Sequence, residues 1–493
     1  MNNPAKVNNS ESLSQRAIKG GFWVFSIRLA DQILFLIRIT VLARLLSPHD
    51  FGLMGIAMLT MAVIETFSQT GFQAALIQKK ERTQDYLDSA WTILIIRGFL
   101  LFIIISVAAP HVATFFNSPE SKLIIQVFGL AILFRAFTNI GVIYFQKELE
   151  FSRQFLYELS GILTHFVVMI VLAVILRNAW ALVLGFLAKN FIQFIVSYII
   201  HPYRPRFHIE MKKVRELFSF GKWVLGSSVL VFLVTQGDDI FVGKILGATM
   251  LGFYQLAYKI SNTPTTEISH VIAQVTFPTY SKLRDDPLRL KEAYLRVLQL
   301  TSFLAFPLAG LIFVLTPEFV LVFLGEKWTP MVPAMQALAL AALVRALVGT
   351  TGPLFHGTGK PKVETFWEMV RLGLLVILIY PLTMKWGILG TSVAVLVSLF
   401  FSNIGFSWNA IKIAQISIKN YMKIVSIPMT SIFLSVLCLF MMKKIIYGGI
   451  VGFLILGCTG IVLYTILVYI LDKLFGCKIF LLAKQSLSML KKI

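Results

Sequence analysis

The sequence predicts an all-α integral membrane protein of about 14 transmembrane helices, built as two six-helix lobes in parallel repeat with two further C-terminal helices. Composition is the first observation behind this prediction. The 493-residue chain is 57% hydrophobic and 14% charged, with a mean hydropathy of +0.79, whereas soluble domains are about 45–50% apolar and about 25% charged. Long apolar segments are the second observation, and an internal repeat is the third.

Apolar segments long enough to cross about 30 Å of hydrocarbon recur along the whole chain. A transmembrane β-barrel would instead show segments of about ten residues with alternating hydrophobicity. The predicted helical spans lie near residues 18–46, 50–77, 86–109, 121–145, 152–176, 179–200, 216–246, 250–278, 292–315, 331–356, 362–383, 387–411, 420–442 and 446–471.

Positive charge orients these spans in the membrane. The formal net charge is +21. If both ends lie on one side, the loops on that side hold most of the Lys and Arg, and the opposite loops hold chiefly Lys122, Lys327, Lys385, Lys443 and Lys444. The positive-inside rule then places both termini in the cytoplasm. Because the excess charge serves topology, nucleic acid is not expected as a partner.

An internal repeat divides the chain. A shift of 200 residues aligns the first predicted helix pair with the seventh and eighth, so that Gly21 meets Gly221. A shift of 210 residues continues the match, with "LAILFRAFTNIGVIYF" on "LAALVRALVGTTGPLF" and Arg135 on Arg345. Six helices separate equivalent positions, so both copies enter the membrane from the same side, as in repeats related by an axis along the membrane normal.

The repeat predicts four regions. Residues 1–201 form an N-terminal lobe, and residues 216–412 form a C-terminal lobe. Between them, residues 202–215 form a linker in which two prolines precede a basic amphipathic run that suits a cytoplasmic-surface helix. Residues 413–493 add two helices and a basic cytoplasmic tail. Two lobes around a midplane cavity are a transporter design, in which rocking between the lobes alternates access.

Several short motifs resemble one family of transporters. They are "LARLLSPHDFGLMGIA", "GDDIFVGKILGATMLGFYQLAYKISNTP", "FPTYSKLRDD", "FLGEKWTP" and "HGTGKPK". Together they resemble the Wzx-type polysaccharide flippases of the WzxC/TuaB-like exporter group, in the multidrug/oligosaccharidyl-lipid/polysaccharide (MOP, MATE-like) superfamily. The resemblance implies a V-shaped protein of the bacterial inner membrane. It also implies that the cargo is an undecaprenyl-diphosphate-linked oligosaccharide, flipped to the outer leaflet for exopolysaccharide, O-antigen or teichuronic-acid-type polymer synthesis.

The first predicted helix carries charges that hydrocarbon tolerates poorly. Each charge at the centre of a spanning helix costs about 2.5–3.5 kcal/mol on insertion scales. Arg28, Asp31 and Arg38 recur at helical spacing on one face, and Arg28 and Asp31 can partly neutralise each other at i,i+3. This face is therefore expected to look into a cavity or toward other helices.

Further ionisable residues lie deep in predicted spans, where they are candidates for function. The candidates for a cavity that binds diphosphate and sugar are Arg28, Arg38, Arg97, Arg135 and Arg345. The candidates for gating or ion coupling are Asp31, Glu65, Asp238, Asp239 and Glu267. Guanidinium groups bind phosphate oxygens through two parallel bonds, which suits an anionic lipid-linked saccharide. The alternative for each residue is an ion pair that fixes helix packing.

Uncharged polar residues are candidates for contacts with sugar hydroxyls. They are Gln69, Thr138, Asn139, Asn190 and Gln236. Hydrogen bonding between helices is the alternative role for each of them.

The repeat also places Arg38 on Asp238, at equivalent depths of the two lobes. We hypothesise that these residues, with Asp239 sharing, close an outer gate that an arriving diphosphate, a cation or a proton releases. The alternative is that each residue pairs within its own lobe.

No sequence motif indicates an enzyme. The seven histidines show no HExxH spacing, and "GTGKPK" lacks the spacing of a Walker A loop. No catalytic residue, metal site or cofactor is therefore expected, and Na⁺ or H⁺ coupling is left open. The expected partners are the lipid-linked oligosaccharide, membrane lipids, and a polysaccharide polymerase or export machinery. A MATE-like cation-coupled antiporter, a membrane polymerase or glycosyltransferase, and a non-transporting scaffold are the alternative functions.

The charge distribution predicts which loops face the cytoplasm. Single cysteines introduced near Asn117 and Trp328 should react with a membrane-impermeant thiol reagent added to intact cells. Cysteines near Lys80, Arg206 and Lys360 should react only after the cells are permeabilised. Labelling of the second group in intact cells would invert the topology.

Overall fold

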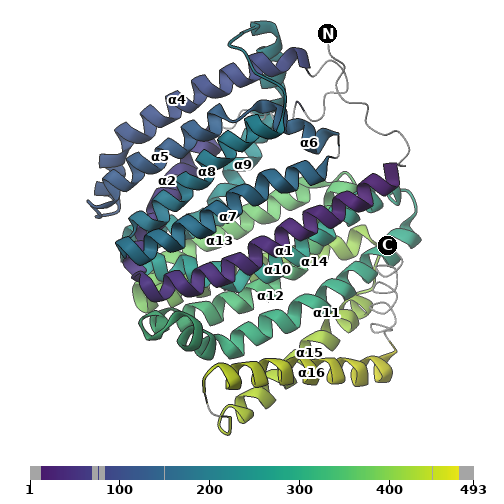
Figure 1. The fold of residues 1–493 in the computed structure, drawn as a ribbon. Helices are drawn as coiled ribbons and strands as arrows, with labels where there is room; N and C mark the ends of the chain where they lie inside the picture. Colours follow the sequence, from purple (N-terminus) through teal and green to yellow (C-terminus); the bar gives the residue numbers. More distant parts are fainter. Residues whose placement is uncertain (1–12, 69–75, 77–83, 149, 447, 477–493) are drawn as a thin grey trace. The chain divides into compact units, whose positions relative to one another are not determined.

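The computed structural model describes residues 1–493 apart from 1–12, 69–75, 77–83, 149, 447 and 477–493 (Figure 1). Every regular element in the described part is a helix. The prediction of an all-α protein is therefore confirmed. The first eight elements are α1 (Leu13–Leu45), α2 (Pro48–Phe67), α4 (Gln84–Phe115), α5 (Ser121–Phe137), η1 (Ile140–Val142), α6 (Ile143–Lys147), α7 (Phe151–Leu176) and α8 (Trp180–Ile200).

The remaining elements follow a long linker. They are α9 (Met211–Leu246), α10 (Ala248–Lys282), α11 (Pro287–Phe319), η2 (Val320–Leu324), η3 (Glu326–Met331), α12 (Val332–Gly357), α13 (Pro361–Trp386), α14 (Ile388–Ile413), α15 (Ile418–Met442) and α16 (Ile450–Phe475). The chain divides into two compact units. Unit 1 comprises Met1–Phe232 and Gly247–Thr249, and unit 2 comprises Leu233–Leu246 and Met250–Ile493.

Many of these helices are suited to a bilayer. Among the described residues, 10 helices are long and apolar enough to cross a membrane, and α5 with α6, bent by 70°, makes 11 if the pair is one span. Three further helices, α1, α9 and α10, have 33, 36 and 35 residues, so length alone would let each cross. They carry charged residues within that length and fall outside the apolar group. The number of 14 spans stays a prediction.

The two units repeat one packing scheme. In unit 1, α4 packs against α5, α7 packs against α8, and α5 packs against α8. In unit 2, the corresponding contacts join α11 with α12, α13 with α14, and α12 with α14. The bounds of α7 and α13 differ by the 210 residues of the predicted shift. In unit 2, α15 and α16 pack against each other and against α11.

A helix break distinguishes unit 1 from this shared scheme. The helix α5 ends at Phe137, and the chain bends by 70° before α6 continues. The side chain of Asn139 caps the new start by accepting a hydrogen bond of 2.9 Å from the backbone N–H of Gly141. The equivalent helix of unit 2, α12, runs without a break. The repeat therefore conserves the packing of these helices but not the path of the backbone.

The linker does not begin as a helix. Residues 201–210 have no helical structure, and α9 starts at Met211. Pro202 and Pro205 lack the N–H that a helix needs, and other N–H groups of the linker bond to side chains of α4. Asp88 accepts from Arg206 at 2.8 Å, and Ser89 accepts from Glu210 at 3.0 Å. The surface helix expected in the linker is therefore absent from its first nine residues, 202–210.

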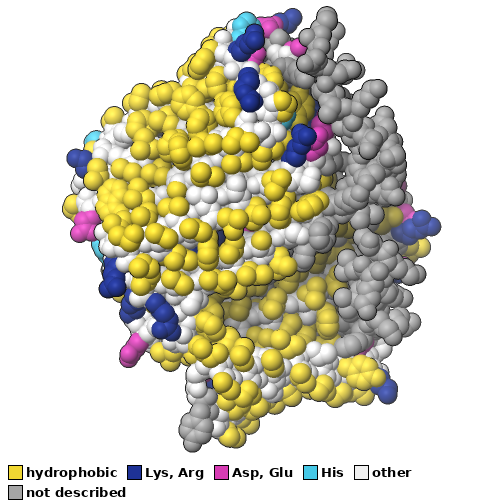
Figure 2. Space-filling model, in the orientation of Figure 1, with side chains coloured by type: hydrophobic (Ala, Val, Ile, Leu, Met, Phe, Trp, Pro, Cys, Tyr) yellow, Lys and Arg dark blue, Asp and Glu magenta, His cyan; other side chains and the backbone are white. Residues whose placement is uncertain are grey.

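The surface of the helices is largely apolar. Figure 2 shows hydrophobic side chains over most of the visible helix faces, with charged side chains gathered toward helix ends. Exposed large hydrophobic residues include Leu100, Ile103 and Val107 on α4, each more than half exposed. Apolar faces of this kind suit contact with lipid chains. Trp328 itself is fully buried and packs against Phe253, whereas its neighbours Lys327 and Thr329 are exposed. The labelling cysteine near Trp328 is therefore best placed at Thr329.

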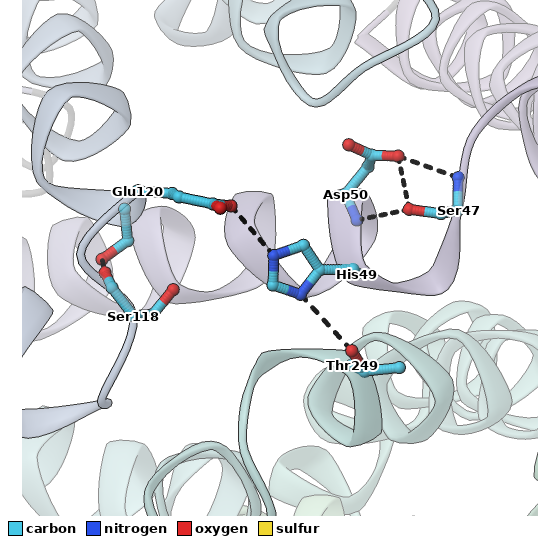
Figure 3. A network of polar contacts seen from close by, with 7 residues as sticks. Ser47, His49, Asp50, Ser118, Glu120 and Thr249 are labelled. Atoms are coloured by element: carbon cyan, nitrogen blue, oxygen red, sulfur yellow. Dashed lines mark hydrogen bonds and ion pairs between the residues drawn. The ribbon is translucent and has the colours of Figure 1, made fainter.

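The start of α2 is fixed by a polar network (Figure 3). Ser47 and Asp50 form a reciprocal capping box. The ring of His49 contacts Glu120 at 3.0 Å through Nε2 and Thr249 at 3.3 Å through Nδ1. Unit 1 therefore holds the short segment Gly247–Thr249 against α2.

A glycine permits this contact. A Cβ atom on Gly52 would lie 1.8 Å from the backbone oxygen of Ala248. The mutation Gly52→Ala should therefore lower stability by about 1–3 kcal/mol, the usual cost of overpacking. Thermal unfolding of the purified protein in detergent measures this effect. The control is Gly373→Ala, because a Cβ there meets nothing within 4 Å. An unchanged melting temperature for Gly52→Ala would contradict the described contact.

Candidate functional site

Two adjoining cavities lie within unit 1. The first, of about 370 Å³, surrounds the break after α5, and we call it the break chamber; its polar lining comprises Arg135, Thr138, Asn139, Gln146, Gln154, Tyr157, Glu158, Asn190 and Gln193. The second, of about 400 Å³, is the basic chamber, lined by Ile27, Arg28, Asp31, Tyr157, Glu158, Ile162, Lys189 and Gln193. Tyr157, Glu158 and Gln193 line both cavities, so the chambers adjoin.

Helical periodicity brings these side chains together. Gln154, Tyr157 and Glu158 are spaced i, i+3 and i+4 along α7, so they lie on one face. Asn190 and Gln193 are spaced i and i+3 on α8. The helix α7 packs against both α1 and α8, and α1 supplies Arg28 and Asp31 to the basic chamber. Each polar stripe thus faces a cavity, as expected for α1.

The deep charges of unit 1 are predominantly positive. Two cations, Arg28 and Lys189, share the basic chamber with two carboxylates, Asp31 and Glu158. Around them lie three more arginines and one more glutamate on the same unit's helices, namely Arg38, Arg97, Arg135 and Glu65. These five cations and three carboxylates leave an excess of two positive charges. The charge balance of these eight described residues therefore favours an anion.

Arg135 combines an ion pair with access to a cavity. Its guanidinium bonds to the Glu65 carboxylate at 2.7 Å, and its side chain lines the break chamber. The side chain of Arg135 is 52% exposed. Since a guanidinium has five N–H donors, Arg135 can hold Glu65 and still bind a second anion. The structure thus joins two sequence candidates, Arg135 and Glu65.

Arg97 has a different environment. Its Nε donates to the backbone oxygen of Ser68 at 2.8 Å, and its Nη2 donates to the hydroxyl of Ser68 at 2.7 Å. Ser68 is the C-cap of α2, where carbonyl groups lack partners within the helix. Arg97 is not among the residues lining the two chambers. These bonds correspond to the packing alternative for Arg97, and its role in cargo binding stays a prediction.

Arg38 and Asp238 each have a partner within their own unit. Arg38 bonds to Nδ1 of His165 at 2.6 Å. Because a guanidinium only donates, Nδ1 must accept, which requires a neutral ring protonated at Nε2. Asp238 accepts a hydrogen bond of 2.6 Å from the hydroxyl of Tyr254. These contacts correspond to the alternative in which each residue pairs within its own lobe. The gate between Arg38 and Asp238 stays a hypothesis.

Unit 2 holds a buried cluster of charges. Asp238 and Asp239 on α9 are 3% and 8% exposed, and one carboxylate oxygen of each has no hydrogen-bond partner. Arg345 on α12 donates to the hydroxyl of Tyr258 at 2.5 Å, while its Nε and Nη2 are buried without partners. Arg371 on α13 bonds to Glu368 at 3.3 Å. Partial satisfaction of buried charges is costly and often marks function.

The remaining sequence candidates are placed as follows. Thr138, Asn139 and Asn190 line the break chamber. Glu267 lies on α10 and Gln236 on α9, both half-buried, and Gln69 is outside the described residues.

Lys189, deep in the predicted span 179–200, is one of the ionisable residues that the sequence marks as functional candidates. Two other candidates were not found from the sequence, namely His165 and Arg371. Arg371 lies within the predicted span 362–383, so a complete list of deep charges would have found it. No sequence signal distinguishes His165 as the partner of Arg38, because 127 residues separate the two.

Comparison with known proteins identifies the family of this chain. Residues 41–333 match the family described as "Polysaccharide biosynthesis protein", which is more than half of the chain. The chain belongs to this family. The membership confirms the resemblance that the sequence motifs indicate.

Curated relatives in the family cover most of the chain. The lipopolysaccharide biosynthesis protein WzxC of Escherichia coli is 26% identical over 74% of this chain and 75% of its own length. The teichuronic acid biosynthesis protein TuaB of Bacillus subtilis is 23% identical over 72% of this chain and 74% of its own length. The succinoglycan biosynthesis transport protein ExoT of Rhizobium meliloti is 22% identical over 68% of both chains.

Two solved transporter structures share the fold of this chain. The lipid II flippase MurJ, in an inward closed conformation, matches with a TM-score of 0.75 and 17% identity, over 92% of this chain and 99% of that one. An inward-facing multidrug resistance MATE transporter of the MOP superfamily matches with a TM-score of 0.58 and 15% identity, over 78% and 95% of the two chains. At such identities the likeness concerns the fold alone.

Arg135 and Arg97 of unit 1 should respond differently to substitution by alanine. Arg135→Ala should lower polysaccharide export about tenfold or more at normal protein abundance, because it removes a charged hydrogen-bond donor from a cavity. Arg135→Lys should recover only part of the export, since an ammonium cannot form the two parallel bonds. Arg97→Ala should instead lower protein abundance, because the end of α2 loses its donor. Immunoblots and export assays separate these outcomes, and normal export by Arg135→Ala would make Arg135 a packing residue.

Proposed function

We propose that this protein translocates an oligosaccharide linked to undecaprenyl diphosphate across the cytoplasmic membrane. The single observation that carries the proposal is the pair of chambers in unit 1, which places cations and uncharged polar groups side by side within apolar helices. Family membership and relatives named for polysaccharide biosynthesis and transport support the same function. The MurJ-like fold supports a flippase mechanism.

The diphosphate is the part of the cargo that unit 1 attracts. A diphosphate diester carries about two negative charges, and charge-assisted hydrogen bonds to phosphate are among the strongest in proteins. We assign Arg28, Lys189 and Arg135 to this contact, because they line the chambers. Arg97 is bonded to the end of α2, so it contributes positive potential rather than direct bonds. Arg38 is bonded to His165 and would contact the diphosphate only after release from that partner. In unit 2, Arg345 contributes to its own buried cluster.

We place the binding site of the coupling ion in unit 2. Asp238 and Asp239 are buried carboxylates with unsatisfied oxygens, and the positive charges of Arg345 and Arg371 act on Asp238. Binding of Na⁺ or H⁺ would lower the free-energy cost of burying these carboxylates. We therefore assign Asp238 and Asp239 to ion coupling, while Asp31 shares the basic chamber with Arg28 on the same helix and Glu65 balances Arg135 of α5. Glu267 stays a candidate for gating or coupling. Release of Arg38 by the arriving diphosphate is the complementary event in the gating hypothesis.

The proposal includes a place in the cell. Both termini lie in the cytoplasm of a bacterium, and the protein is a multi-pass component of the inner membrane. It alternates access between its lobes and performs no covalent chemistry on the cargo. It hands the flipped lipid to a polysaccharide polymerase or export machinery. The alternative in which the cargo is a small cationic drug is disfavoured, because the positive charges of unit 1 would repel that cargo.

A deletion strain tests the function. Loss of the gene should cause lipid-linked oligosaccharide to accumulate on the cytoplasmic side of the membrane and should abolish the surface polysaccharide. Purified protein in proteoliposomes should then move the accumulated lipid between leaflets, and Na⁺ and proton gradients applied in turn should identify the coupling ion. Normal surface polysaccharide in the deletion strain would contradict the proposal. Normal export by a variant that lacks every cavity arginine would favour the scaffold alternative.

A further inference from the structure

The two chambers of unit 1 differ in chemistry. Apart from the residues that line both chambers, the basic chamber has three charged lining residues, Arg28, Asp31 and Lys189. Among the described residues that line the break chamber, Arg135 supplies one guanidinium, and the other unshared polar side chains are uncharged, namely Thr138, Asn139, Gln146, Gln154 and Asn190. A single lipid-linked saccharide presents the same two chemistries next to each other, because an anionic diphosphate is bonded directly to a neutral sugar.

We propose that the break chamber is a carbohydrate subsite, which binds the sugar attached to the diphosphate while the diphosphate lies toward the basic chamber. The proposal rests on the proposed function and adds a recognition site to it. It assigns specificity for the saccharide to Gln154, Asn190 and Gln193, on facing stripes of α7 and α8.

Carboxamide side chains suit this ligand. An amide offers two donors and an acceptor, and a sugar hydroxyl is both donor and acceptor. Gln154 donates from Nε2 to Glu158 at 2.7 Å, while its Oε1 is buried without a hydrogen-bond partner. An acceptor left unsatisfied in an apolar environment costs free energy, which a donor on the ligand would recover. Tyr157, on the same face, adds an aromatic ring to the wall.

The wall of the chamber is built before any ligand arrives. Asn139 bonds through its side chain to the N–H of Gly141 at 2.9 Å and to the backbone oxygen of Tyr203 at 2.6 Å. Its backbone N–H bonds to the hydroxyl of Ser197 at 2.9 Å. Asn139 is therefore a structural residue of the break, and the candidate recognition groups are on α7 and α8. Of these, Asn190 donates from Nδ2 to the backbone oxygen of Phe186 at 2.8 Å, which leaves its Oδ1 as the group for a ligand. A volume of about 370 Å³ lies within the roughly 300–1,000 Å³ range of small-molecule sites.

Gly161 offers a way to perturb the subsite without removing a polar group. A Cβ on Gly161 would lie 2.6 Å from Cδ of Gln193. Because the amide is the far end of a flexible side chain, the fold can accommodate Gly161→Ala by moving Gln193. The amide would then leave the position from which it faces both chambers.

The test compares two lipids on the full-length protein in detergent. One is the lipid-linked oligosaccharide that accumulates in the deletion strain, and the other is undecaprenyl diphosphate without sugar. The wild type should bind the first lipid more tightly, and the ratio of the two dissociation constants measures recognition of the sugar. Gln154→Ala, Gln193→Ala and Gly161→Ala should each lower this ratio about two- to tenfold, as expected for the loss of one or two neutral hydrogen bonds.

Two further variants separate sugar recognition from diphosphate binding and from general damage. Lys189→Ala should weaken binding of both lipids and leave the ratio unchanged. Gln126→Ala is the matched control, because Gln126 bonds to the backbone of Ser106 on α4 and lies outside both chambers; it should keep the wild-type ratio.

The outcomes are distinguishable. A lower ratio in the three chamber variants alone supports the subsite. A wild-type ratio in all three, with both lipids still bound, overturns the subsite and leaves the proposed function intact. If no lipid-linked oligosaccharide accumulates in the deletion strain, the proposed function fails and the subsite fails with it.

Discussion

Charged and polar groups inside hydrocarbon need a partner or water, and most features of this structure follow from that constraint. Arg97 satisfies the open end of α2, and Arg38 bonds to the ring of His165. At the break after α5, the side chain of Asn139 accepts from the backbone N–H of Gly141, and its own backbone N–H donates to Ser197. Where no side chain fills this role, the helices of unit 1 enclose a polar cavity. The cavities thus hold the polar and charged groups that helix packing leaves available to a ligand.

The two repeats share one packing scheme but differ in their buried charges. Equivalent helices make equivalent contacts in both units, which reflects the pattern of apolar residues that duplication preserved. Unit 1 has more positive than negative deep charges and a broken helix, whereas unit 2 buries Asp238 and Asp239 beside Arg345. The two units therefore carry different charge distributions on one shared packing scheme.

The linker between the lobes also supports the candidate site. The backbone oxygen of Tyr203 accepts from Asn139 at the helix break, and its hydroxyl donates to Asp88 on α4 at 2.6 Å. Burial, together with the neighbouring Asp88 carboxylate, raises the pKa of Tyr203 above its usual range, so the hydroxyl keeps its proton and donates. Residues near Tyr203 and Asn139, including Ile140 and Trp91, form one apolar cluster. The segment that joins the lobes therefore stabilises the wall of the break chamber.

The sequence by itself determined the class of protein, the repeat and the family, because these depend on composition, spacing and short motifs. It also identified the face of α1 that carries Arg28 and Asp31, since helical periodicity is a local property. Only the tertiary structure decided which deep charges line a cavity and which support packing. Arg97 and Arg135 are alike in sequence, yet one caps α2 and the other lines the break chamber. Their roles differ because they depend on residues distant in the chain, such as Ser68 and Glu65, and no local pattern encodes such contacts.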